Sequence, residues 1–110
     1  MEKVIKTKLT NEEIINIAFD AIEGCYGIVG VCQKGVNKIN ILTKTQAKKG
    51  ITVFPTGTNG AFKVEVYLVL SKDVKISETI RECQKVLRYT LNKKSNKLCN
   101  KVDIYVLGVK

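Results

Sequence analysis

The chain has 110 residues, of which 45% are hydrophobic and 26% are charged, and its net charge is +9. This length fits one domain, residues 1–110, and leaves no room for a second. The sequence contains no histidine, which excludes His-based acid–base catalysis, Ser-His and Cys-His nucleophile pairs and histidine metal ligands.

The first third of the chain predicts a strand, a helix and a second short strand. Residues 3–9 alternate loosely and are interpreted as an edge strand. Thr10 and Glu13 form a capping-box pattern ahead of a helix, and we expect Gly24 to end that helix in a left-handed conformation. Residues 26–33 indicate a short buried strand or a tight extended turn.

The middle of the chain predicts a hairpin. Residues 51–55 and 61–71 are rich in strand-forming residues and flank a turn containing Asn59-Gly60, which is typical of a tight hairpin connection. In the second of these strands the apolar side chains alternate with polar and mixed ones, so one face is apolar. The pattern of residues 34–49 does not identify a helix or a strand.

The last third predicts a helix and a closing strand. Ser77 is the expected N-cap of a helix whose buried stripe contains Cys83, Leu87 and Leu91, and Asn96 is expected to end it. Residues 102–109 alternate as a final strand. The resulting order, β-α-β-β-β-α-β, predicts an α+β two-layer sandwich with both helices on one face of a single mixed sheet.

The sheet face opposite the helices is the candidate partner face. If the alternation holds, this face carries more apolar surface than a purely solvated sheet. A scatter of single exposed apolar residues is the competing interpretation. The side chains expected on this face are Phe54, Tyr67, Val69, Tyr105 and Leu107.

The positive charge is distributed unevenly along the chain. Two stretches, residues 34–50 and 85–101, contain lysines and an arginine but no acidic residue. This asymmetry favours a polyanionic partner, either nucleic acid or an anionic membrane, although a merely solvated surface also explains it. The candidate polyanion-binding residues are Lys85, Arg88, Lys93, Lys94, Lys97 and Lys101.

No motif of a known catalytic or metal site is present. The four cysteines (Cys25, Cys32, Cys83, Cys99) lack the close pairing of a structural zinc site, so we interpret them as reduced, buried thiols. The Gly27–Gly30 segment matches the spacing of a KH-domain loop but carries apolar middle residues, and GAFKVEVY departs from the RRM signature. We expect no enzyme activity, no cofactor and no small-molecule substrate.

Several segments carry a family resemblance. They are LTNEEIINIAFDA followed by GIVG, KKGITVF, AFKVEVYLVL followed by DVKISETIRECQKVL, and the closing VDIYVLGV. Together they resemble the alkaline-shock-protein family, also called YloU-like, of Gram-positive bacteria and their relatives, over about residues 9–30 and 49–109. The chain departs from the family pattern at Ser77, Asn96 and Asp103, where the family often has Pro, Gly and Asn.

The resemblance implies a non-enzymatic cytoplasmic protein linked to cell-envelope homeostasis or stress. It implies a protein partner, such as an integral-membrane protein or a dihydroxyacetone-kinase-like kinase, and it carries over no catalytic residue. The N-terminus is charged and no apolar run approaches the length of a membrane span, so any membrane association is expected to occur through a partner. The leading hypothesis is an interaction module that self-associates or docks on such a partner; polyanion binding is the alternative.

Overall fold

The computed structural model describes residues 10–33, 35, 40–56, 60–95 and 99–110. The predicted edge strand at residues 3–9, Asn59 of the hairpin turn and the helix end at Asn96 lie outside these residues. The elements in chain order are α1 (Asn11–Glu23), β1 (Ile28–Val31), the 3-10 helix η1 (Lys44–Lys49), β2 (Ile51–Pro55), β3 (Phe62–Leu70), α2 (Ile76–Lys94) and β4 (Cys99–Val109).

Strand β3 is the centre of a mixed sheet. Strand β4 runs parallel to it along one edge, whereas β1 and β2 are both antiparallel to it. The Tyr67 N–H donates to Gly50 O (3.0 Å), and the Tyr67 carbonyl accepts from the Cys32 N–H (2.9 Å). Because both backbone groups of one strand residue point to the same side, β1 and β2 lie end to end along a single edge of β3.

The close approach of β1 and β2 explains why residue 50 is a glycine. A Cβ atom at this position would meet the carbonyl of Cys32 and would lie 2.7 Å from Cγ1 of Val31. The backbone φ of Gly50 is −129°, so the requirement here is space and not an unusual conformation.

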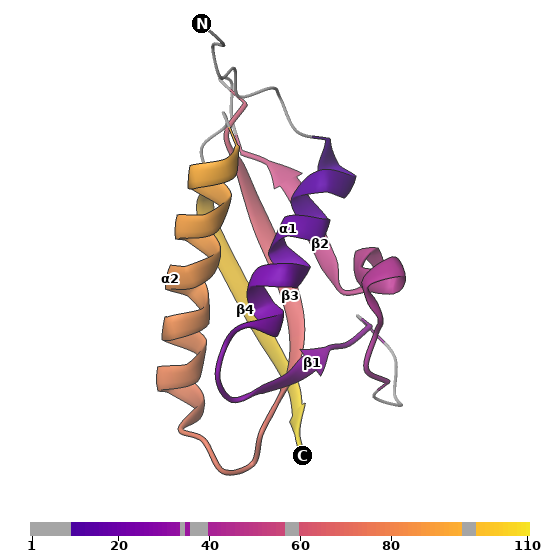
Figure 1. The fold of residues 1–110 in the computed structure, drawn as a ribbon, viewed down its shortest axis with the longest axis vertical. Coiled ribbons are helices and arrows are strands. Elements are labelled where there is room, and N and C mark those ends of the chain that lie inside the picture. Colours follow the sequence, from indigo (N-terminus) through magenta and orange to yellow (C-terminus); the bar gives the residue numbers. More distant parts are fainter. Residues whose placement is uncertain (1–9, 34, 36–39, 57–59, 96–98) are drawn as a thin grey trace, which may run out of the picture.

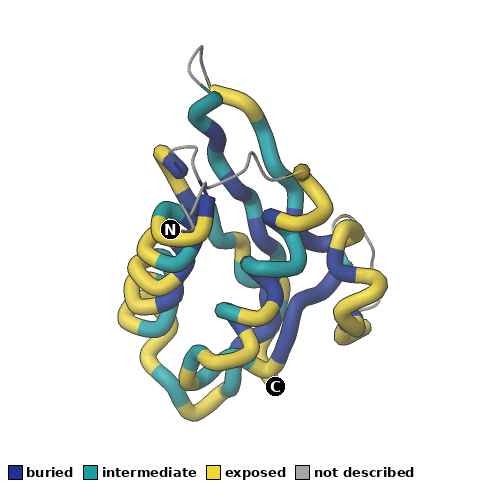
Figure 2. The backbone as a smooth tube through the Cα atoms, turned by 45° about the horizontal axis from the view of Figure 1, so that its top comes forward, coloured by how far each residue is buried: buried dark blue, intermediate teal, exposed yellow. Residues whose placement is uncertain are grey.

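Both helices cover the same face of the sheet, as predicted (Figure 1). The buried residues gather between the two layers in Figure 2. Apolar burial of this kind is the main stabilising contribution to such a domain. The core joins Ile14, Ala18, Phe19 and Ile22 of α1, Cys83, Leu87 and Leu91 of α2, and Val64, Val66, Leu68, Leu70 and Val102 of the sheet.

The predicted start of α1 is confirmed, whereas its predicted end is wrong. Thr10 Oγ1 accepts from the Glu13 N–H (3.1 Å), and Glu13 Oε1 accepts from the Thr10 N–H (2.8 Å), which is a complete capping box. Gly24 has φ −88° and is not left-handed. The positive φ occurs instead at Gly27 (+86°), immediately before β1, because the chain continues beyond α1 as a turn before it reverses.

Helix α2 begins one residue before the predicted cap. Its N-cap is Lys75, whose side chain makes no capping bond, so Ser77 lies inside the first turn and its prediction as the cap is wrong. The Thr79 N–H donates to Lys75 O (3.0 Å), which places the first helical turn ahead of Ser77. The predicted buried stripe of α2 is confirmed.

Side chains of α2 also bind the outer edge of β4. Gln84 Nε2 donates to Val102 O (2.9 Å), and Asn92 Oδ1 accepts from the Cys99 N–H (2.6 Å). Strand β4 therefore begins at Cys99, before the predicted start at residue 102, and its first part is protected from pairing with another strand.

Residues 40–49, for which the sequence predicted no element, lie first beside β1 and then beside α1. Cys32 and Ile41 form an isolated antiparallel bridge, and the Leu42 N–H donates to Val31 O (2.8 Å). Helix η1 follows and packs beside α1, where Lys44 Nζ lies 2.9 Å from Asp20 Oδ2.

Candidate interaction surfaces

The face of the sheet opposite the helices, called the second face below, is built by residues that pair directly across the strands. Directly paired residues place their side chains on the same face. In the first row of side chains across the sheet, Phe54 pairs with Lys63, which pairs with Lys101. In the second row, Glu65 pairs with Asp103. In the third row, Tyr67 pairs with Tyr105.

The two tyrosines of the second face form a stacked pair. Their ring centroids are 4.9 Å apart and the ring planes differ by 18°. Tyr67 is half-buried, whereas Tyr105 is 42% exposed. Tyr105 therefore presents an aromatic ring to solvent, and its stacking on Tyr67 holds that ring in place.

An ion network lies next to the tyrosine pair. Lys63 Nζ is 3.5 Å from Glu65 Oε2 and 3.9 Å from Asp103 Oδ2, and Lys101 Nζ is 3.6 Å from Asp103 Oδ1. Lys63 Nζ also lies 5.3 Å from the centroid of the Phe54 ring. The lysines offset the repulsion that two carboxylates on adjacent strands would otherwise exert.

The acidic side chains act on the tyrosine hydroxyl. The pKa of Tyr105 is raised, first by the negative charge of Glu65, then by desolvation and by the charge of Asp103, while Lys63 opposes the shift. The shift disfavours the tyrosinate form, so the neutral phenol remains a hydrogen-bonding group on an apolar ring.

The residues predicted for the partner face have different outcomes. Tyr105 and Leu107 are exposed, and Phe54 and Tyr67 are half-buried. Val69 is completely buried, so its prediction as a partner-face residue is wrong. It pairs with Gly30, and the side chain of Ile41 occupies the space in front of Gly30, so Ile41 covers this end of the face.

Leu107 owes its position to a β-bulge. Leu68 pairs with Val106 and Val69 pairs with Gly108, so Leu107 has no partner on β3. A bulge of this kind bends the strand and disturbs its edge. Because α2 covers the start of β4 and the bulge interrupts its end, the second face is a better candidate surface than the strand edge.

The predicted polyanion-binding residues do not form one surface. Lys85 and Arg88 are exposed on α2, Lys93 and Lys94 lie in its last turn, and Lys97 lies outside the described residues. Lys101 projects from the second face and pairs with Asp103. The sequence reasoning missed Arg81, which precedes the acid-free stretch but lies one helical turn before Lys85 on the same side of α2.

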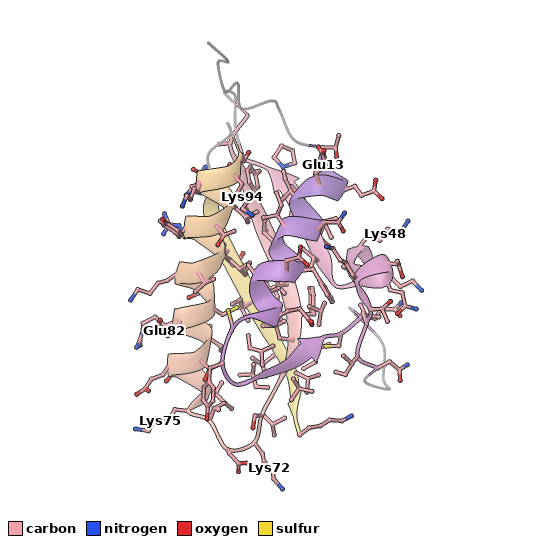
Figure 3. The ribbon with its side chains drawn as sticks, viewed as in Figure 1. Glu13, Lys48, Lys72, Lys75, Glu82 and Lys94 are labelled. Carbon is pink, nitrogen blue, oxygen red and sulfur yellow. The ribbon has the colours of Figure 1, made fainter. Side chains whose placement is uncertain are left out.

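The two basic stretches are also separated from each other. Helix α1 packs against α2 on one side and against η1 on the other, as Figures 1 and 3 show. In Figure 3, Lys48 of η1 and Lys94 of α2 lie on opposite sides of α1. The exposed surface of α1 carries no basic residue but four acidic ones, Glu12, Glu13, Asp20 and Glu23.

The cysteines lie in positions that suppress nucleophilic chemistry. Cys32, Cys83 and Cys99 are fully buried, Cys25 is half-buried, and all four are free thiols. Desolvation is the first cause that raises the pKa of each, most strongly for Cys83, so the thiolate form is disfavoured. Among the described residues, no group of three or more acidic or cysteine side chains is placed to bind a metal ion.

Comparison with known proteins agrees with the family resemblance seen in the sequence. The model of the alkaline-shock-protein family, named after alkaline shock protein 23, is described as having a cell envelope-related function and matches residues 1–110. YloU of Bacillus subtilis (strain 168) is 33% identical over 105 residues, covering 93% of this chain and 86% of the relative. The protein Spy1614 of Streptococcus pyogenes serotype M6 is 28% identical over 106 residues, covering 94% and 86%.

No solved structure gives a significant match. Within the described part of the chain, none of the helices has the length and apolarity needed to cross a bilayer.

Proposed function

Because the chain belongs to the alkaline-shock-protein family, whose function is related to the cell envelope, we propose that it is a non-enzymatic interaction module acting by self-association or by docking on a membrane-linked partner. We place the contact on the second face of the sheet, centred on Tyr105.

The exposed half of the tyrosine pair is the observation that carries this proposal. Of the described helices, α1 and α2 both pack on the other face, which leaves the Tyr67–Tyr105 stack facing outward. Aromatic side chains that are fixed in place and partly exposed lose little conformational entropy on binding and are enriched at the centres of interfaces. The surrounding charges form a polar rim of the kind that encloses such centres.

The test is a charge placed on the tyrosine pair. We expect Tyr105→Asp to abolish self-association, measured by light scattering, or to abolish recovery of a membrane-linked partner in a nuclease-treated pull-down. The matched control is Tyr26→Asp, because Tyr26 is a tyrosine with 87% exposure that lies outside the second face. Circular dichroism of both variants checks folding.

The outcome for both tyrosines decides whether the surface is correct. If Tyr67→Asp and Tyr105→Asp both retain every association of the unmodified protein, the second face is not the contact surface.

A further inference from the structure

The outer surface of α2 carries a row of cations that the second face does not use. Arg81, Lys85 and Arg88 are all exposed and recur at intervals of four and three residues, so they lie on one side of the helix. From Arg81 to Arg88 the row extends about 10 Å along the helix axis. After Glu82 no acidic residue occurs in α2, so the C-terminal half of the helix is uniformly basic.

The cations of this row are available to a ligand. Neither Arg81 nor Arg88 forms an ion pair with another residue that the structure describes. Lys85 Nζ lies 3.7 Å from Glu82 Oε2, but both side chains are about 70% exposed and such a pair is weak. Guanidinium groups in this state suit phosphate oxygens, which they bind through two parallel hydrogen bonds.

These cations surround a depression in the surface. It is lined by Arg81, Gln84, Lys85, Arg88, Tyr89 and Asn92. The Tyr89 ring is 66% exposed, and Lys93 Nζ lies 5.5 Å from its centroid. An exposed aromatic ring inside a basic depression is the arrangement on which unpaired bases stack while the cations follow the phosphate backbone.

The charge of the neighbouring helix, α1, favours a single nucleic-acid strand over a flat anionic membrane as the ligand. The exposed surface of α1, beside α2 in the same layer, carries acidic residues at Glu12, Glu13, Asp20 and Glu23. A flat anionic membrane laid on the helix layer would meet these carboxylates together with the cations and would be repelled by them. A single strand that follows α2 avoids α1.

We propose that the outer surface of α2 from Arg81 to Tyr89 binds single-stranded nucleic acid, with Arg81, Lys85 and Arg88 contacting phosphates and Tyr89 stacking on a base. The contacts read no base edge, so binding is independent of sequence.

The binding experiment uses the full chain and a fluorescein-labelled oligouridine, followed by fluorescence anisotropy over a salt series. Three phosphate contacts predict a log–log slope of affinity against salt of about −2, since each contact on a single strand contributes about −0.7. Arg88→Gln should reduce the magnitude of the slope by about 0.7. Tyr89→Ala should weaken binding about tenfold.

A charge-matched control separates a site from net charge. Arg81→Glu/Arg88→Glu should abolish binding, whereas Lys48→Glu/Lys49→Glu, an equal change of charge on η1 beyond α1, should retain most of it. Equal losses in the two double variants would overturn the proposal. So would the absence of oligouridine binding at low salt, or binding to vesicles containing phosphatidylglycerol or to polyglutamate without binding to oligouridine.

Discussion

The two faces of β3 are held by different interactions. On the helix side Val64, Val66 and Leu68 are completely buried, and any apolar side chain of the right volume would serve the same purpose. On the second face Lys63, Glu65 and Tyr67 are only partly covered. Lys63 and Tyr67 each interact with a side chain of β4, and Glu65 pairs with Lys63 on its own strand. The first face therefore determines whether the chain folds, and the second is free to carry recognition.

This comparison predicts a large difference in stability between substitutions on the two faces. Leu68→Ala should lower the free energy of unfolding by about 2–5 kcal/mol, because it leaves a cavity in the core. Tyr105→Ala should cost much less, since it removes a half-exposed ring that stacks on only one neighbour. Urea denaturation measures both. If the two losses are equal, the second face is a structural element and not a recognition surface.

The junction between β1 and β2 affects both faces at once. In Gly50→Ala the added methyl group would collide with the Cys32 carbonyl, a backbone atom that cannot rotate away. The two strands must then separate along β3, and we expect a loss of about 3 kcal/mol in the free energy of unfolding. Gly24→Ala is the matched control, because its nearest neighbour, Ala21 O, would be 3.6 Å from the new Cβ. A near-neutral Gly50→Ala would show that β1 and β2 are not in contact.

The sequence predicted what depends on periodicity. The alternation in β3 and the helical spacing of Cys83, Leu87 and Leu91 each identify a buried face, and they give the layers correctly. From α1 onward the predicted order of helices and strands is also correct, whereas the strand predicted at residues 3–9 lies outside the described residues. The capping box of Thr10 was found for a similar reason, because it depends on residues only three positions apart.

Two local predictions failed, the left-handed helix end at Gly24 and the cap at Ser77. The other failures depend on contacts between distant segments. The buried Val69 pairs with Gly30, against which Ile41 lies, and Ile41 belongs to a segment with no periodic pattern. The bulge at Leu107 changes the alternation of β4 without any local signal. The separation of the basic stretches by α1 is likewise a property of the layer arrangement, which charge counts along the chain do not contain. The tyrosine pair could be placed on one face, but its stacking depends on the parallel register of β3 and β4.

The smallest expected effect is also the one that distinguishes the faces most directly. For Cys83 on the helix side, desolvation is the first cause of the raised pKa, whereas for Tyr105 the charge of Glu65 is the first cause. Glu65→Gln should therefore lower the pKa of Tyr105 toward its ordinary value of about 10, followed by the ultraviolet absorbance of tyrosinate with Tyr105→Phe as the control.

The sign of the accompanying stability change is fixed by linkage. Because the folded-state pKa of Tyr105 is raised, its neutral form favours folding at all pH values below its ordinary pKa, and this contribution is lost as the pH rises through the folded-state pKa. In Glu65→Gln that loss should be smaller. Salt should act in the same direction as the substitution, since at about 1 M the screening length falls to about 3 Å. A Tyr105 titration that responds neither to salt nor to Glu65→Gln would mean that burial, as on the helix side, controls the second face.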